Sequence, residues 1–353
     1  MAPASPEWRD FDAVVCAWER LWAEYKVGRW SGFKESTEVG HHPFWAYNWS
    51  FGALLSACGK LTWLPDGRTL VEEVEGDLLA SVRTYESGDG LMDSIPHQSD
   101  EFPGGIYFDD NAWIGLAALD LYEGLRHKPW LEIAQGLYQG IVSRGLDVGS
   151  GGILWRQIPP RTVHVCSTGP TLLLGLRLWR LAQGDGRGID PKMLAMEQWV
   201  RSMQRADGLF NDHVDLVSGR VDTRVFTYNA GTPLEAYMHL AAVDVLRAPL
   251  WKDRAMSVLR GLPLFFHETG RYPCTPWFNV VLLRALLQAA TAFDVSAFVQ
   301  PFMLAIEESW DAFLHTRECL SLACLRDEPI TRLLRDKAAA LETLVLLHHY
   351  AYA

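Results

Sequence analysis

The chain has 353 residues, of which 49% are hydrophobic and 21% charged, and this composition excludes a disordered, collagen-like or disulfide-scaffold protein. Its net charge of -11 and the lack of a run of Lys and Arg argue against a nucleic-acid partner. The 15 Trp, 15 Phe and 11 Tyr residues suit a surface that stacks on flat ligands, and the acidic balance favours sugars over bases.

Apolar residues recur at helical spacing along the whole chain. In 10–25 one face is apolar, with intervals of three, four and seven residues, whereas 45–60 is apolar nearly all round. The same alternation continues to the C-terminus. Further amphipathic segments are 69–85, 129–145, 190–204, 251–266 and 299–314, and further uniformly apolar segments are 110–125, 166–182, 228–245, 277–292 and 333–350.

An amphipathic helix lies on the outside of a bundle and a helix that is apolar all round is buried, so these segments form six outer–inner pairs. The repeat of roughly 55 to 60 residues is far from that of a tetratricopeptide array. We therefore predict an all-α (α/α)6 toroid of twelve helices, forming a single domain over residues 1–353. Few segments read as strands, although short hairpins in the loops are compatible with the pattern.

The loops inside each predicted pair are mostly long and rich in Gly, Pro, Asp and Ser. Long ordered loops in a compact domain are usually functional, and in a toroid they emerge together around the N-terminal ends of the inner helices. We expect the functional site on that face. The loops are 26–44, 86–109, 146–165, 205–227, 267–276 and 315–332.

Aromatic, amide and carboxylate residues gather at these inner helix starts. Sugar recognition needs this mixture, because flat rings cover C–H surfaces and polar groups bind hydroxyls. For the tryptophans at loop–helix junctions we favour stacking on a ligand over packing. The predicted sugar-binding residues are Trp45, Asn48, Tyr107, Asn111, Trp113, Trp155, Ser167, Asp212, Tyr228, Asn229 and Trp277.

The adjacent pair Asp109 and Asp110 is the sharpest of these features. Glycoside hydrolysis uses two carboxyl groups, about 5–5.5 Å apart in retaining enzymes and about 6.5–9.5 Å apart in inverting ones. Adjacent residues at a helix start diverge by about 100° and can place their carboxyl groups about 5 Å apart, which favours retention. Two carboxylates this close resist joint ionisation, which yields one acid and one anion. A plain helix N-cap role is the competing interpretation.

The histidines show no metal-binding spacing along the chain. His97, His164 and His213 are isolated in loops, and we interpret them as surface or structural residues, with His97 and His213 the better candidates for neighbours of the site. The predicted chemistry requires no metal and no cofactor. Six cysteines are scattered without a CxxC pair, which predicts reduced, mostly buried thiols; they are Cys16, Cys58, Cys166, Cys274, Cys319 and Cys324.

The N-terminal segment has neither a basic region nor an apolar region of the kind found in a secretory signal, so we expect a cytoplasmic protein. A secreted protein whose signal had been removed would read the same. No uninterrupted apolar stretch is long enough to span a bilayer, so no membrane partner is expected.

Several motifs resemble those of glycoside hydrolase family 76, the α-1,6-mannanases. Residues 107–113 read YFDDNAW and resemble the family motif DDNAW. Residues 151–155 (GGILW) and 167–170 (STGP) are similar to the family's GGIxW and SNGP segments. Residues 208–212 (GLFND) and 227–231 (TYNAG) are similar to its GLxxD and TYNQG segments. DDNAW together with TYNxG is fairly specific, whereas the glycine motifs alone are weak.

This resemblance implies an (α/α)6 barrel and a retaining double displacement on a mannose-containing oligosaccharide or glycoside. It implies that Asp109 is the nucleophile and Asp110 the acid/base, and that Asp212, Tyr228 and Asn229 line the −1 mannose site. Many members read DDNAWW, whereas Ile114 follows the motif here, which suggests that one aromatic platform is missing. The expected cytoplasmic location favours oligosaccharides or short glycosides over polymeric mannan.

Two other function classes fit the sequence less well. A carbohydrate-binding or sensing toroid without catalysis would bind saccharide without turnover, but the intact Asp pair argues against it. A helical interaction scaffold would expose a large apolar patch and have no sugar affinity. Endo against exo action and the oligomeric state stay open.

Overall fold

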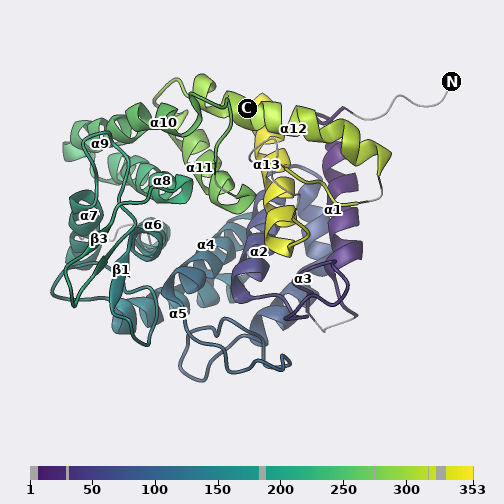
Figure 1. Cartoon of the computed structure of the whole chain (residues 1–353), viewed down its shortest axis with the longest axis horizontal. Coiled ribbons are helices and arrows are strands. Elements are labelled where there is room, and N and C mark those ends of the chain that lie inside the picture. The colour runs from purple at the N-terminus through teal and green to yellow at the C-terminus, as the bar shows by residue number, and fades with distance from the viewer. Residues whose placement is uncertain are drawn as a thin grey trace.

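The structure is a computed structural model that describes residues 7–28, 32–182, 188–273, 275–316, 318–322 and 331–352. Twelve long helices of these residues form two concentric rings (Figure 1). The inner helices are α2 (Asn48–Leu61), α4 (Phe108–Leu125), α6 (Val165–Leu181), α8 (Thr227–Val243), α11 (Pro276–Ala289) and α13 (Leu334–Tyr352). The outer helices are α1 (Phe11–Tyr25), α3 (Gly67–Arg83), α5 (Lys128–Gly145), α7 (Pro191–Ser202), α9 (Ala248–Gly261) and α12 (Ser296–His315).

The inner ring is closed. Each inner helix packs against the next, and α13 packs against α2 to complete the circle. The prediction of an (α/α)6 toroid is confirmed, and its physical basis is visible in burial: α1 buries one stripe of residues three and four apart, whereas α4 is buried on nearly every side. None of the described helices combines the length and the apolarity needed to cross a membrane.

Three helix boundaries differ from the prediction in ways that matter. α4 begins at Phe108 and not at 110, because the preceding loop is fixed by a backbone hydrogen bond from Phe108 to the carbonyl of Trp155, 2.8 Å long. α2 begins at Asn48, since Tyr47 before it is extended and Trp45 forms a β-bridge with Lys34. The predicted segment 251–266 is broken at Leu262, where Pro263 starts the short helix α10 (Pro263–Phe266).

A small antiparallel sheet joins two of the long loops. Its strands are β1 (Thr162–His164), β2 (His213–Asp215) and β3 (Val221–Asp222), in the order β1–β2–β3. The β2–β3 pair is a hairpin within one loop, as the sequence allowed, but β1 comes from another loop and pairs across to β2. The η1 turn (Val245–Arg247) lies between α8 and α9.

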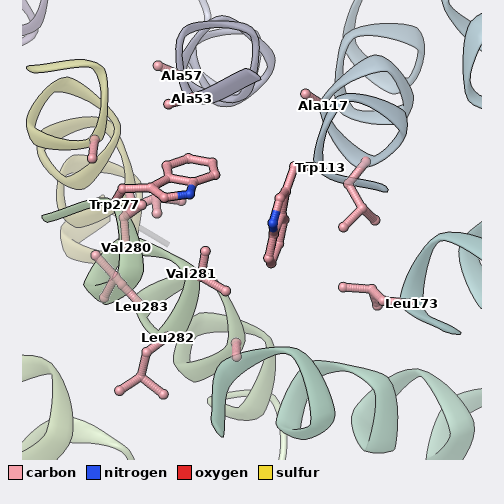
Figure 2. Packing of buried hydrophobic residues seen from close by; sticks show 14 of the residues in the cluster. Ala53, Ala57, Trp113, Ala117, Leu173, Trp277, Val280, Val281, Leu282 and Leu283 are labelled. Atoms are coloured by element: carbon pink, nitrogen blue, oxygen red, sulfur yellow. The ribbon is translucent and has the colours of Figure 1, made fainter. Parts of the chain in front are cut away.

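The centre of the ring is filled with side chains. Trp113 from α4 and Trp277 from α11 meet there edge to face, with ring centroids 5.9 Å apart (Figure 2). Their exposed fractions are only 6% and 1%. Small residues of α2 and α4, among them Ala53, Ala57 and Ala117, border this pair in the same view. The two indoles therefore form the floor of the space enclosed by the helix N-termini.

The C-terminal halves of the inner helices hold buried ion pairs. Asp120 of α4 lies 2.7 Å from Lys60 Nζ of α2 and 2.7 Å from an Arg177 guanidinium nitrogen of α6. Gly59 makes this approach possible, because a Cβ at this position would lie 2.5 Å from Asp120 Cβ. Further along the ring, Arg284 of α11 pairs with Glu342 of α13. Charged groups thus tie neighbouring inner helices together below the floor.

The described cysteines are free thiols, and Cys58, Cys166 and Cys319 are buried while Cys16 is partly exposed. Cys274 and Cys324 lie outside the described residues.

Candidate active site

A cleft of about 960 Å³ opens at the N-terminal ends of the inner helices, on the face where the long loops were expected. It is lined by aromatic rings, carboxylates, imidazoles and two arginines. Its lining includes His42, Trp49, Tyr107, Asp109, Asp110, Trp113, Trp155, Thr162, His164, Cys166, Asp212, His213, Arg224, Phe226, Tyr228, Trp277, Phe278 and Arg335.

Asp109 and Asp110 lie in the first turn of α4, not before it. The N-cap residue is Tyr107, and no side chain caps this helix end, so the competing N-cap interpretation of the Asp pair is wrong. Asn111 fixes the turn, because its amide donates to the carbonyls of Met92 and Tyr107 and accepts from Met92 N–H. The pair is thus held at the cleft by two loops and one helix start.

The two carboxyl groups have different electrostatic surroundings. Burial raises the pKa of Asp109 to about 6, although the Trp155 indole N–H, which donates to Asp109 Oδ2 over 3.1 Å, lowers it. Burial and the charge of Asp109 raise the pKa of Asp110 well above its ordinary value. Because the negative charge of Asp109 raises the pKa of Asp110 further, the surroundings favour an anion at Asp109 and an acid at Asp110, which is the split expected of a glycosidase pair.

One side-chain oxygen of Asp109 is buried without a hydrogen bond to any described residue. Asp109 Oδ1 is buried and has no partner among the described residues, while Oδ2 accepts from Trp155 and, over 3.5 Å, from the Cys166 thiol. Buried polar atoms are nearly always paired, so an unpaired carboxylate oxygen in a cleft indicates a functional position.

A second wall of the cleft is built by β1 and β2. The rings of His164 and His213 stack there with centroids 4.3 Å apart and planes 9° apart. Asp212 lies beside both, with Oδ2 2.9 Å from His213 Nδ1 and 3.9 Å from His164 Nδ1. Burial and the neighbouring His213 lower the pKa of His164 to about 3, so His164 is neutral. These histidines were expected to be isolated, and the structure corrects that expectation.

A third wall is aromatic. Trp49 stacks on Phe278, which in turn contacts Tyr228 with centroids 4.1 Å apart. The guanidinium of Arg335 lies 4.3 Å from the Trp49 ring centre. Rings from α2, α8 and α11 therefore present a continuous surface suited to the C–H faces of a sugar.

Eight of the predicted residues line the cleft. They are Tyr107, Asp109, Asp110, Trp113, Trp155, Asp212, Tyr228 and Trp277. Trp277 is 1% exposed and packs against Trp113 and the Arg284 guanidinium, so packing dominates over stacking at this position.

Five predicted residues do not line the cleft, which corrects their expected placement. Asn48 and Ser167 are fully buried at the starts of α2 and α6. The side-chain amide of Asn111 is fully hydrogen-bonded to the backbone of Met92 and Tyr107. Asn229 is buried and donates to Asp212 Oδ1 over 2.9 Å, so it supports a lining residue. Trp45 packs edge-on against Phe44 in the extended segment before α2.

The structure also explains Ile114, which stands where many family members have a second Trp after DDNAW. Its side chain is fully buried against Gly52 of α2 and is not part of the cleft lining. The expectation of a missing aromatic platform is therefore wrong for this protein, since a side chain at 114 packs between helices.

Sequence reasoning missed several lining residues. Phe226 and Phe278 each adjoin a predicted helix start, so their positions carried a usable signal. His42 and Arg224 lie in loops without a motif, where no pattern indicated them. His213 was anticipated as a neighbour of the site, whereas His97 bonds the Glu86 carbonyl outside the cleft lining.

Comparison with known proteins gives the family. The family model described as Glycosyl hydrolase family 76 matches residues 17–292. No curated protein matches the chain significantly.

Solved structures match over nearly the whole chain. A family 76 mannosidase from Bacteroides thetaiotaomicron VPI-5482 has a TM-score of 0.82 at 18% identity, covering 97% of this chain and 98% of its own. An inactive variant of the α-1,6-mannanase of Salegentibacter sp. HEL1_6, in complex with α-1,6-mannotriose, has a TM-score of 0.75 at 18% identity, covering 97% and 99%. Dfg5 from Chaetomium thermophilum, in complex with glucosamine, has a TM-score of 0.68 at 16% identity, covering 96% and 90%.

At these identities the matched structures establish the fold, and the family model, which spans well over half of the sequence, establishes the membership: the chain is a glycoside hydrolase that belongs to family 76.

Proposed function

We propose that this hydrolase cleaves α-1,6-mannosidic linkages in oligosaccharides or short glycosides, with retention at C1. The observation that carries the proposal is the partly buried Asp109–Asp110 pair at the cleft, where burial raises both pKa values and the charge of Asp109 raises that of Asp110 further. The resemblance of residues 107–113 to the family motif and the α-1,6-mannotriose bound by the Salegentibacter relative support the choice of linkage.

The mechanism is a double displacement on these two residues. The Asp109 carboxylate attacks C1 of mannose while Asp110 gives its proton to the leaving glycosidic oxygen, so the C1–O bond breaks as the C1–Asp109 ester forms. Asp110, now ionised, takes a proton from a water whose oxygen attacks C1 and releases Asp109. Mannose leaves with its α configuration, and both carboxyl groups return to their starting states. The Trp155 N–H stabilises the Asp109 carboxylate before attack and after release.

The remaining walls would bind the sugar. Asp212, held by Asn229, and Tyr228 are the resemblance-based candidates for the −1 mannose, and Trp49 and Phe278 offer stacking surface. A volume of about 960 Å³ is near the upper end of the range of roughly 300–1,000 Å³ for ligand pockets, which suits a short oligosaccharide.

The test is a linkage panel. The protein is incubated with α-1,2-, α-1,3- and α-1,6-mannobiose and with α-1,6-mannotriose, and the products are separated by chromatography. We expect cleavage of the α-1,6 compounds only, loss of cleavage in Asp109→Asn and Asp110→Asn, and normal cleavage in the control Asp66→Asn, an exposed residue outside the cleft. Saccharide binding by the unaltered protein without cleavage of any compound would instead favour a sugar-binding toroid.

A further inference from the structure

The hydrolysis proposed above gives no role to the two stacked histidines of the second wall. Their proximity follows from strand register, because His164 of β1 is directly opposite His213 of β2, and side chains of directly paired residues lie on one face of a sheet. The planes of the two rings are only 9° apart and their centroids 4.3 Å apart. The imidazoles therefore form a short column of parallel rings beside the cleft.

A third ring extends this column. Leu154 forms an antiparallel bridge with Val163 of β1. One residue further on, the Trp155 backbone N–H donates to the Thr162 carbonyl over 2.9 Å. Trp155 is thus opposite Thr162, and its side chain lies on the same face of the sheet as that of His164. The indole stacks on the His164 ring, with centroids 5.3 Å apart and planes 26° apart, so the column runs from the indole through both imidazoles.

Polar contacts and burial hold the two imidazoles. His164 Nε2 lies 2.9 Å from Thr162 Oγ1, and His213 Nδ1 lies 2.9 Å from Asp212 Oδ2. The side chains of His164 and His213 are 10% and 19% exposed. Burial and the neighbouring His213 lower the pKa of His164 to about 3. The imidazole next to the indole is therefore an uncharged ring at neutral pH, and it packs on the indole by stacking.

The indole at the end of the column contacts the proposed nucleophile. Trp155 Nε1–H donates to Asp109 Oδ2 over 3.1 Å. The backbone of Trp155 is fixed by its hydrogen bonds, but its side-chain torsions have several staggered minima, and the residue is only partly buried. Contacts with the ring itself must therefore select the orientation of the N–H. They come from His164, which stacks on the indole, and from Tyr107, which meets it at 66°.

We propose that His164 is a positioning residue, which holds the Trp155 indole so that its N–H stays directed at Asp109, with His213 packed behind the His164 ring. This role rests on the proposed function, because it bears on turnover only if Asp109 attacks the sugar. The bond to Oδ2 orients the carboxylate and leaves Oδ1, which has no partner among the described residues, for C1 of the substrate.

The pKa of Asp109 reports whether the indole is in place. The polar and ionisable side chains next to Asp109 are Asp110 on the same helix, Cys166 of α6 and the Trp155 indole, whose N–H lowers this pKa. His164 is not among the main influences on Asp109. Loss of the His164 ring should therefore raise the pKa of Asp109 through the indole alone.

The experiment is a ¹³C NMR titration of the full chain labelled at the aspartate carboxyl carbons, with the Asp109 signal assigned by its loss in Asp109→Asn. Trp155→Phe should raise the titration midpoint of this signal, and His164→Ala should raise it to a comparable extent. The double variant Trp155→Phe/His164→Ala should shift it no further than Trp155→Phe alone. His164→Phe, which restores a flat ring, should return the midpoint to near that of the unaltered protein.

The matched control is His267→Ala, a histidine with a side chain 54% exposed, away from the cleft lining, and it should leave the midpoint unchanged. Circular dichroism checks the fold of each variant. If His164→Ala does not fold, His164→Gln, which keeps a polar group near Thr162 but lacks a ring, takes its place. An unmoved midpoint in the folded ringless variant would overturn the proposal. A shift in the double variant that adds to that of Trp155→Phe would overturn it as well, because His164 would then act without the indole.

The titration needs no turnover, which separates this proposal from the proposed hydrolysis. The expected shifts in a protein that cleaves no mannoside would contradict the hydrolysis and support the positioning of the indole by His164. Cleavage of α-1,6-mannobiose with an unmoved midpoint in His164→Ala would do the reverse. Where both hold, the acid limb of kcat/KM in His164→Ala should move to higher pH together with that of Trp155→Phe.

Discussion

Helix α4 carries aspartates toward both ends, and their pKa values are shifted in opposite directions. At the C-terminal end, Asp120 is paired with Lys60 and Arg177, whose charges lower its pKa to about 2 despite burial. At the N-terminal end, burial raises the pKa of both Asp109 and Asp110, and no cation is among the main influences on either. The residue type is the same, but Asp120 is 3% exposed and paired with cations, whereas Asp109 and Asp110 are partly exposed at the cleft and have no such partners among the described residues.

Along this one helix, Asp120 therefore serves the stability of the fold, whereas Asp109 and Asp110 serve the proposed reaction. A buried carboxylate with two cationic partners ties three inner helices together and has no free proton to exchange near neutral pH. Two adjacent carboxylates without cations destabilise the folded state, but they provide one proton and one anion at the cleft.

The largest effect should come from removing either carboxylate of the pair. Asp109→Asn removes the nucleophile and Asp110→Asn the proton donor, so each should lower kcat by at least about 10²–10⁴-fold. Initial rates on α-1,6-mannobiose measure this, with circular dichroism as the check of folding. Turnover at the normal rate in either variant would remove that residue from the mechanism.

The next effect concerns stability at the other end. Asp120→Asn leaves Lys60 and Arg177 buried without their carboxylate, and breaking a buried pair in this way typically costs about 3–5 kcal/mol. Urea denaturation should show this loss, while kcat of the molecules that stay folded should remain close to normal. The exposed control Asp66→Asn should shift neither quantity. A selective loss of kcat in Asp120→Asn at unchanged stability would contradict this division of roles.

The catalytic variants should have the opposite effect on stability. A raised folded-state pKa means that the contribution of Asp109 to stability is complete below its unfolded value and is lost as the pH rises through about 6. Asp109→Asn, which cannot ionise, should therefore raise Tm at pH 7–8 and leave it nearly unchanged at pH 4. Thermal melts at the two pH values test this, and a lower Tm at pH 8 would show that the ionised carboxylate stabilises the fold.

The smallest effect is a shift in a pH profile. Since Asp109 must be ionised to attack, kcat/KM should fall as the pH drops below about 6. Trp155→Phe removes the N–H that lowers this pKa, so the acid limb should move to higher pH. The profile of both proteins on α-1,6-mannobiose gives the comparison; an unmoved limb would mean that the indole has no electrostatic influence on Asp109.

The sequence was sufficient for the fold because helix type is encoded locally: apolar stripes and fully apolar segments gave the two rings with boundaries within a few residues. It was also sufficient to place Asp109 and Asp110 at the cleft, since the start of α4 follows from the same pattern. Side-chain direction at the other helix starts was harder to predict. Asn48 and Ser167 lie at the expected starts yet point into the protein, and only packing with neighbouring helices decides this.

The histidine wall could not be predicted for a different reason. His164 and His213 are 49 residues apart in sequence, and they meet because β1 pairs with β2 in one register. A three-residue strand has too little pattern to fix a register, so no local signal brings the two rings together. The position of Trp45 could not be predicted for the same reason. Its backbone forms an antiparallel β-bridge with Lys34, and this pairing depends on how the preceding loop folds.

The most direct test of the central claim is the anomeric configuration of the first product. α-1,6-Mannotriose is mixed with the enzyme in an NMR tube, and the anomeric protons are followed before mutarotation equilibrates them. Attack by Asp109 followed by attack of water predicts that the newly formed reducing end appears first as the α anomer, and that Asp109→Asn produces none. Early appearance of the β anomer would show a single displacement and contradict the assignment of Asp109 as the nucleophile.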